Sequence, residues 1–192
     1  ILRSDEEPEI TPISYEFPDE WKSTYDALVI SDYNKGFITQ EKLFELSNWF
    51  QGPVFIDTKK TCIPGNAFIK VNESEFKKIT HFIPDNMIIT KGGEGTEYQG
   101  KLYPAEKVNV FDVVGAGDTF LAALTYGYLK YGRMEEAIPL ANKAAAVAVS
   151  HRGTYVLTEE DVKKKQMYIL EIHSNLKEIA RLVSEVEHDG GK

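Results

Sequence analysis

The chain has 192 residues with a net charge of −8, of which 42% are hydrophobic and 27% charged. This length supports one α/β domain with a sizeable core, and the negative charge argues against general affinity for nucleic acid or anionic membranes. A single cysteine, Cys62, excludes an internal disulfide, and no stretch approaches the roughly 20 apolar residues of a membrane span. With no visible signal peptide, we expect a cytoplasmic protein.

Taken in order, the chain predicts alternating strands and helices. Residues 1–20 are acidic and contain prolines, which predicts an extended arm or edge strand leading into a short helix at 18–23. Apolar runs predict buried strands at 27–30, 54–56, 67–71 and 87–90, and shorter strands at 98–103 and 108–111. Helices are predicted at 39–50, from Asn72 onward, and at 118–131 and 134–150.

This alternation predicts an α/β fold with three layers, in which a mostly parallel sheet carries helices on both faces. Ligands in such folds bind beyond the carboxyl ends of the strands. Polar segments follow the predicted strands at 31–36, 57–60 and 91–95. We therefore expect these segments to meet at one edge of the sheet.

The most informative stretch is a short glycine-containing loop that opens into an apolar helix. Gly115 and Gly117 allow backbone N–H groups to turn toward one point. The helix beginning near Asp118 adds unpaired N–H groups and the positive end of its dipole. This combination predicts a pocket for a developing anion, with Asp118 able to take a proton from an attacking hydroxyl. The alternative is a plain glycine turn with Asp118 as a helix cap.

Two other glycine motifs do not fit. Gly115 and Gly117 begin like a dinucleotide-binding fingerprint, but Phe120 stands at the position of the third glycine. Residues 95–101 have the glycine spacing of a P-loop, but Leu102 replaces the Ser or Thr that would hold magnesium.

Residues 112–120 read Asp-x-x-Gly-Ala-Gly-Asp-Thr-Phe, which resembles the signature of the ribokinase-like (PfkB) carbohydrate kinases. The resemblance implies a ribokinase-like fold and ATP-dependent phosphoryl transfer to a sugar hydroxyl. It makes Asp118 the catalytic base and assigns the anion hole to Gly115, Ala116 and Gly117. It covers about residues 1–158 and only the C-terminal part of a family member, so we expect a fold that lacks the N-terminal part, supplied by a longer chain or a partner.

The same resemblance implies an ATP and magnesium site. Asn72 and Glu75 form the family's Asn-x-x-Glu pair, which would bind Mg²⁺ through water, together with phosphate. Spacing alone favours an N-cap followed by an acid in the first helical turn, and the resemblance reverses this preference. Asp112 and Val114 fall where some members bind a monovalent cation, but Val114 replaces the Thr common there, which weakens the expectation of a potassium requirement.

Further nucleotide contacts are implied by three segments. Residues 90–95 resemble the family's phosphate-contacting turn, which makes Thr90, Gly92 and Gly95 candidates, although the pattern also fits an ordinary hairpin turn. The helix that flanks the adenine in the family carries Asn142 and Ala145, and small-residue packing is the alternative for the alanine. His151, near the end of that helix, is a candidate for the base pocket.

Two loops resemble the heptose-7-phosphate kinases of the same family, as does the opening at residues 2–7. They are Asp-Tyr-x-Lys-Gly at 32–36 and Asp-x-Lys at 57–59. The resemblance makes Asp32, Lys35 and Lys59 candidates for substrate binding, with the lysines meeting phosphate groups. A lone lysine is more often a solvated surface residue, which is the alternative for both.

The tail, residues 159–192, predicts an amphipathic helix separate from the kinase part at 1–158. Apolar residues alternate at spacings of three and four, namely Ile169, Ile172, Leu176, Ile179, Val183 and Val186. The helix would pack on its own domain or form a coiled coil, for instance in a homodimer.

Two other functions stay open on these residues. One is a non-catalytic nucleotide-binding or interaction protein with this fold, and the other is a vitamin or nucleoside kinase of the same superfamily. The phosphate acceptor is not determined by the motifs.

Overall fold

The computed structural model describes residues 10–79, 85–158 and 161. The chain divides into two compact units, Ile1–Thr154 and Tyr155–Lys192, and the fold below is that of the first unit. The amphipathic helix predicted at 159–192 lies outside the described residues except for Asp161, so that helix and the domain boundary at 158 stay predictions. Within the described part of the chain, no helix is long and apolar enough to cross a membrane.

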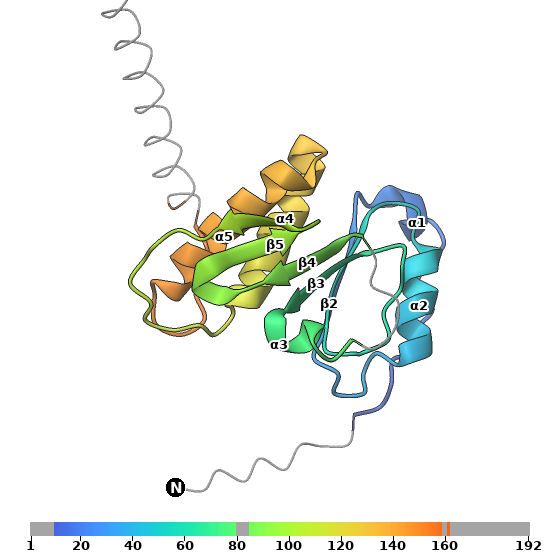
Figure 1. Ribbon diagram of the computed structural model, residues 1–192. Coiled ribbons are helices and arrows are strands. Elements are labelled where there is room, and N and C mark those ends of the chain that lie inside the picture. The colour runs from blue at the N-terminus through green and yellow to red at the C-terminus, as the bar shows by residue number, and fades with distance from the viewer. Residues whose placement is uncertain (1–9, 80–84, 159–160, 162–192) are drawn as a thin grey trace, which may run out of the picture. The chain divides into compact units, whose positions relative to one another are not determined.

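A six-stranded sheet forms the centre of the first unit (Figure 1). Its strands follow chain order across the sheet: β1 (Leu28–Asp32), β2 (Val54–Thr58), β3 (Phe68–Asn72), β4 (Met87–Thr90), β5 (Gly95–Tyr98) and β6 (Lys101–Pro104). The first four strands are parallel, and β5 and β6 are antiparallel. The predicted mostly parallel sheet is therefore confirmed.

Helices cover both faces of this sheet, as Figure 1 shows for α2 on one side and α4 with α5 on the other. The helices are α1 (Trp21–Thr24), α2 (Gln40–Trp49), α3 (Glu73–Phe76), α4 (Ala116–Tyr131) and α5 (Met134–Val149), and η1 (Gly92–Glu94) is a 3₁₀ turn. Neighbouring residues of a strand face opposite sides of the sheet. Accordingly Ile56 packs in one core with Leu43 of α2, while Phe55 packs in a second core with Leu124 of α4.

The helix boundaries follow from local side chains and backbone angles. Thr39 caps α2 as predicted, because its side chain accepts a hydrogen bond from the backbone N–H of Lys42 at 3.1 Å. Gly115 is the N-cap of α4, with a left-handed φ of 77° that favours glycine. Asp118 therefore lies in the first turn of α4, and its interpretation as the helix cap is wrong.

Two predicted strands are not formed. Residues 108–111 have no strand structure, and Val110 is 62% exposed. The alternating apolar pattern there resembled a half-buried strand, but the chain pairs instead with the end of α5, where Val149 O accepts from the N–H of Phe111 at 2.8 Å. Residues 10–20 also form no strand, which leaves the extended arm of the two alternatives predicted for this segment.

The first strand is less buried than its apolar sequence predicts. β1 lies at the edge of the described sheet, next to β2 only. Ile30 and Val29 face opposite sides of the sheet: Ile30 packs in the core with α2 at 4% exposure, whereas Val29 is 45% exposed.

Candidate active site

A cavity of about 200 Å³ lies at the carboxyl-terminal edge of the parallel strands. It is formed by the loops after β1, β2 and β3 and by the start of α4, with the lining residues Ser31, Asp32, Tyr33, Asp57, Lys59, Lys70, Glu75, Gly115, Gly117 and Asp118. The expected meeting of polar loops at this edge is therefore confirmed for the segments after β1 and β2.

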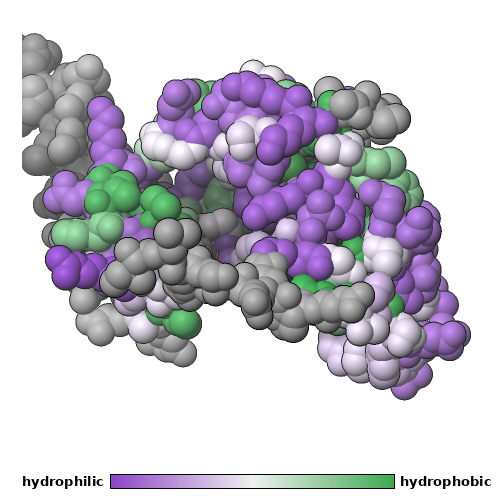
Figure 2. Space-filling model, turned by 90° about the horizontal axis from the view of Figure 1, so that it is seen from below, coloured by the Kyte–Doolittle hydropathy of each residue, from purple (hydrophilic) through white to green (hydrophobic). Residues whose placement is uncertain are grey.

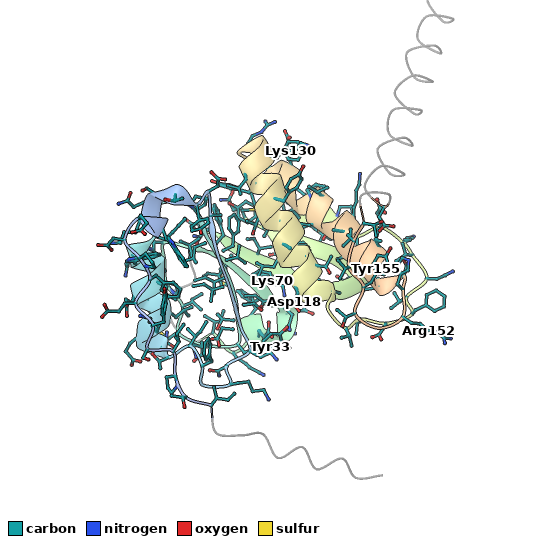
Figure 3. The ribbon with its side chains drawn as sticks, turned by 180° about the vertical axis from the view of Figure 1, so that it is seen from behind. Tyr33, Lys70, Asp118, Lys130, Arg152 and Tyr155 are labelled. Carbon is teal, nitrogen blue, oxygen red and sulfur yellow. The ribbon has the colours of Figure 1, made fainter. Side chains whose placement is uncertain are left out.

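Two hydroxyl groups from the end of β1 hold the Asp118 carboxylate. Ser31 Oγ donates to Asp118 Oδ1 at 3.2 Å, and Tyr33 Oη donates to Asp118 Oδ2 at 2.8 Å. The pKa of Tyr33 is raised above its ordinary value of 10.0, chiefly because its proton is shared with this carboxylate. Figure 3 shows Tyr33 and Asp118 at the N-terminal end of α4. The arrangement orients the carboxylate toward the cavity that both residues line.

The glycine turn before α4 is tied to the loop after α5. The Asp112 carboxylate accepts hydrogen bonds from the N–H of Val114 at 3.0 Å and from the N–H of Gly153 at 3.1 Å. These two donors lower the pKa of Asp112 below its usual 3.8. Because Asp112 stands three residues before Gly115, the carboxylate braces the backbone that leads into the turn.

Asn72 and Glu75 form a reciprocal cap at the start of α3. Asn72 Oδ1 accepts from the N–H of Glu75 at 2.9 Å, and Glu75 Oε2 accepts from the N–H of Asn72 at 2.8 Å. This is the N-cap arrangement that their spacing also allowed. Glu75 nevertheless lines the cavity with Asp118, so its carboxylate is placed to face a ligand there.

Asp32 is buried at the end of β1 and its carboxylate is used inside the protein. Oδ2 accepts from Thr58 Oγ1 at 2.9 Å and pairs with Lys60 Nζ at 3.3 Å, while Oδ1 accepts from the N–H of Asn34 at 2.9 Å. With 6% of its surface exposed, Asp32 shapes the loop that carries Tyr33. Asp32 also lines the cavity, so its predicted substrate role stays a prediction beside this structural one.

The two predicted substrate lysines differ in position. Lys59 is exposed and lines the cavity, and its Nζ lies 5.2 Å from the centre of the Tyr33 ring. Lys35 is exposed in the loop after β1 and does not belong to the cavity lining. Of these two predicted lysines, Lys59 is the one that lines the same cavity as Asp118.

Asn142 on α5 is buried, with 6% of its surface exposed. Thr96 Oγ1 donates to Asn142 Oδ1 at 2.7 Å, and Asn142 Nδ2 donates to the carbonyl oxygens of Tyr103 at 2.9 Å and Pro104 at 3.3 Å. The amide therefore joins α5 to β5 and β6. These internal bonds occupy the groups that a nucleotide would need, so we leave Asn142 out of the proposed site.

The other nucleotide candidates on α5 also make internal contacts. Ala145 is half-buried and packs against the core beneath α4 and α5. His151 Nδ1 lies 2.8 Å from the carbonyl oxygen of Val147, so that nitrogen carries the proton and donates. Neither residue lines the Asp118 cavity.

The turn after β4 mixes exposed and buried positions. Thr90 ends β4 and its hydroxyl donates to the carbonyl oxygen of Val71 at 3.3 Å. Gly92 is exposed in η1, with a φ of 55° and open space around it. Gly95 is buried with a φ of 115°, and a side chain there would overlap the backbone of Tyr103. The structure thus explains Gly95 by packing and leaves Gly92 accessible.

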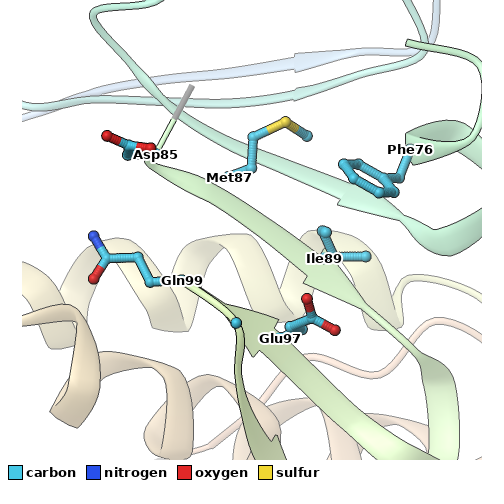
Figure 4. Close-up of a pocket in the computed structure, with 7 residues that line it drawn as sticks. Phe76, Asp85, Met87, Ile89, Glu97 and Gln99 are labelled. Atoms are coloured by element: carbon cyan, nitrogen blue, oxygen red, sulfur yellow. The ribbon is translucent and has the colours of Figure 1, made fainter. Parts of the chain in front are cut away.

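A larger cavity of about 530 Å³ lies beside β4 and β5 (Figure 4). Its lining residues are Phe76, Asp85, Met87, Ile89, Glu97, Gln99 and Gly100. None of these is a predicted site residue, and none lines the Asp118 cavity. The larger of these two cavities is thus not the one that the predicted site residues line.

The face of the molecule in Figure 2 is mainly hydrophilic, with apolar residues in smaller groups.

Comparison with known proteins assigns the chain to a family. The model for the pfkB family carbohydrate kinases matches residues 44–161, more than half of the chain, and the chain belongs to this family. The bifunctional protein HldE of Nitratiruptor sp. is 32% identical over 197 residues, covering 88% of this chain and 42% of the relative. HldE of Pasteurella multocida is 31% identical, over 72% of this chain and 35% of the relative. The chain thus spans less than half the length of these relatives.

Solved structures support the same fold. A ribokinase from Thermotoga maritima matches with a TM-score of 0.63 and 22% identity, over 77% of this chain and 59% of the other. Adenosine kinase from Sinorhizobium meliloti matches with a TM-score of 0.64 and 16% identity, over 79% of this chain and 57% of the other. The ribokinase-like fold predicted from the glycine motif is therefore confirmed.

Sequence reasoning missed several residues at the site. Ser31 and Tyr33 were read only as part of a loop, and their contact with Asp118 joins residues 87 and 85 positions apart. Lys70, inside β3, pairs with Asp57 at 2.5 Å in the cavity wall. A lysine within an apolar strand was the signal that could have indicated Lys70.

Proposed function

We propose that this chain carries the ATP-binding and catalytic part of a carbohydrate kinase, which transfers the γ-phosphoryl group of ATP to a hydroxyl of a sugar phosphate. Heptose 7-phosphate is the preferred acceptor, supported by the two loops that resemble heptose-7-phosphate kinases and by the HldE relatives. The observation that carries the proposal is that Asp118 and the Gly115–Gly117 turn line one cavity at the carboxyl edge of the sheet.

The proposed chemistry follows from the start of α4. The N–H groups of the first helical turn lack partners within the helix and sit at the positive end of its dipole. That of Ala116 donates to the carbonyl oxygen of Val113 at 3.3 Å, so the N–H groups of Gly117 and Asp118 are the proposed donors that stabilise charge on the transferring phosphoryl group. The acceptor oxygen attacks the γ-phosphorus while its proton passes to Asp118. The bond from phosphorus to the ADP oxygen breaks, and ADP leaves with the electron pair.

Asp118 must accept this proton while it is already hydrogen-bonded to Ser31 and Tyr33. Each carboxylate oxygen has two lone pairs, so an acceptor hydroxyl needs only one free position on either oxygen. The two existing donors hold the carboxylate in one orientation, which favours a reactive geometry.

The residues of the cavity fit magnesium bound through water. Among the described residues, no three His, Cys, Asp or Glu side chains are grouped to hold a metal directly. Mg²⁺ usually keeps several waters and binds one or two carboxylates together with substrate phosphates, and Glu75 lines the cavity for such a role. When bound, the ion would neutralise charge on the phosphates.

ADP formation with a panel of sugar phosphates, including heptose 7-phosphate, tests the proposal. We expect Asp118→Asn to lower the rate by about 10²- to 10⁴-fold, the usual contribution of a general base. Asp19→Asn is the control, because the Asp19 side chain is 85% exposed and pairs with Lys22. Equal turnover by the wild type and Asp118→Asn would refute Asp118 as the base.

A further inference from the structure

Lys70 is a buried lysine in the wall of the proposed active site. It lies inside β3 with only 7% of its surface exposed, and its Nζ is 2.5 Å from Oδ2 of Asp57 on β2. Both residues line the cavity with Asp118, and Figure 3 shows Lys70 and Asp118 near the start of α4. A buried cation thus faces the same space as the proposed base.

The ammonium group lies against the glycine turn itself. A Cβ atom added to Gly117 would be 2.9 Å from Lys70 Nζ and 3.8 Å from Asp57 Oδ2. A side chain at position 117 would therefore push the ammonium group away from the turn. Glycine at this position lets the cation approach the backbone that would bind the phosphoryl group.

Charge balance in the cavity favours an anionic ligand for Lys70. Its lining contains the four acids Asp32, Asp57, Glu75 and Asp118 and the two lysines Lys59 and Lys70. A polyphosphate entering this space meets mostly negative charge, so it needs a cation at its point of contact. An ammonium group has three N–H donors, and the bond to Asp57 uses one of them.

The ion pair is poorly explained by stability alone. Removing two charges from water costs free energy that their attraction only partly recovers. Burial raises the pKa of Asp57 even though Lys70 opposes the shift, and the nearby charges of Glu75 and Asp118 add to it. Asp57 is thus a carboxylate held in an unfavourable place beside a cation, which suggests that the cation is needed there.

We propose that Lys70 contacts the transferring phosphoryl group at the Gly115–Gly117 turn, and that Asp57 holds the ammonium group in position before the anion binds. This assignment rests on the proposed kinase function and adds a cationic contact to it. Lys70 then stabilises the negative charge of the phosphoryl oxygens in a water-poor site, where such a contact is stronger than in water.

Calorimetric binding of Mg·ATP, Mg·ADP and pyrophosphate to the whole chain tests the assignment. We expect Lys70→Met to weaken ATP and pyrophosphate binding about tenfold to a hundredfold, as for the loss of a charge-assisted hydrogen bond, and ADP binding less. Lys130→Met is the control, since Lys130 is an exposed lysine at the other end of α4 (Figure 3). It should bind all three ligands like the wild type.

Asp57→Asn separates the role of the pair from a general change in charge. Because Asp57 positions Lys70 in this proposal, Asp57→Asn should weaken pyrophosphate binding when Lys70 is present and change it much less in the Lys70→Met background. Tighter binding by Asp57→Asn would overturn the positioning role of Asp57. Lys70→Met alone leaves the Asp57 carboxylate buried without its partner, whereas the double variant Asp57→Asn/Lys70→Met buries no unpaired charge. Thermal unfolding of the double variant therefore shows whether a loss of binding is caused by a loss of folding.

Each result decides between the two proposals. Equal ATP and pyrophosphate affinities for the wild type and a folded Lys70→Met variant overturn the Lys70 assignment and leave the kinase function standing. Pyrophosphate binding that depends on Lys70, without any ATP binding, supports the anion contact and refutes the kinase function. A wild-type chain that binds neither ligand refutes both.

Discussion

Two polar clusters in this protein look alike in sequence but differ in structure. Around Asn142, the amide and its partner Thr96 are buried and bonded to each other and to backbone carbonyls. Around Asp118, the carboxylate is exposed to a cavity and meets two hydroxyl groups, with a buried ion pair beside it. The family resemblance implied ligand contacts for both. Asn142 is buried and its amide is bonded within the protein, which favours a packing role, whereas Asp118 faces a cavity, which favours a chemical role.

The largest contrast is expected between truncations of these two residues. Asn142→Ala leaves the Thr96 hydroxyl and the Tyr103 carbonyl without their amide partner, each worth about 1–3 kcal/mol. We expect the free energy of unfolding to fall by about 2–4 kcal/mol in urea titrations. Asp118→Ala should change it by about 1 kcal/mol or less, since it removes an acid from the first turn of α4 and two exposed hydrogen bonds.

The affinity of the Asn142→Ala variant for Mg·ATP tests the contrast between Asn142 and Asp118. A folded Asn142→Ala protein should bind Mg·ATP like the wild type, because its amide lies among protein groups. Weaker ATP binding with unchanged stability would return Asn142 to the nucleotide site.

A smaller contrast is expected within the turn after β4. Gly95→Ala places a Cβ 2.6 Å from the backbone nitrogen of Ala105 at a φ of 115°, so we expect a loss of about 1–3 kcal/mol in unfolding free energy, as for overpacking. Gly93→Ala is the matched control, since nothing lies within 4 Å of the added Cβ and its φ is not positive. Equal stability of the two variants would show that the packing account of Gly95 is wrong.

The smallest effect is a pH dependence at Asp112. Its pKa is lower in the folded protein than the ordinary 3.8, because the N–H groups of Val114 and Gly153 donate to the carboxylate. A carboxyl group with a depressed pKa stabilises the fold above its unfolded pKa, and this contribution is lost as the pH falls through the folded value. Asp112→Asn should therefore flatten the stability profile below about pH 4.

Urea midpoints measured between pH 2 and pH 6 check this expectation. Asp26→Asn, at an exposed aspartate before β1, is the comparison variant for the loss of one carboxylate. A wild-type profile that Asp112→Asn leaves unchanged would mean that this carboxylate does not brace the glycine turn.

Much of the fold could be predicted because its signals are local. Apolar runs located β1 to β4, and the helix starts predicted at Thr39 and near Asp118 lie within two residues of the observed starts of α2 and α4. Residues 108–111 failed because alternating apolar residues predict a strand only where a partner strand is available. The edge position of β1, which exposes Val29, also depends on strand order rather than on local sequence.

The site was predictable in part for the same reason. The glycine motif located Asp118 and its turn, since the motif is contiguous. The contacts of Tyr33 with Asp118 and of Lys70 with Asp57 depend on which strands lie side by side, and residue spacing does not reveal that. Residue type alone does not decide the role of Asn142, because an asparagine that binds a ligand and one that joins two elements have the same side chain.

The most direct test of the account is a crystal structure of the chain with magnesium and a non-hydrolysable ATP analogue. We expect the terminal phosphate within hydrogen-bond distance of the backbone N–H groups of the Gly115–Gly117 turn and of Lys70 Nζ, with its phosphorus facing Asp118. A triphosphate bound elsewhere, such as in the larger cavity beside β4 and β5, would contradict the proposed active site.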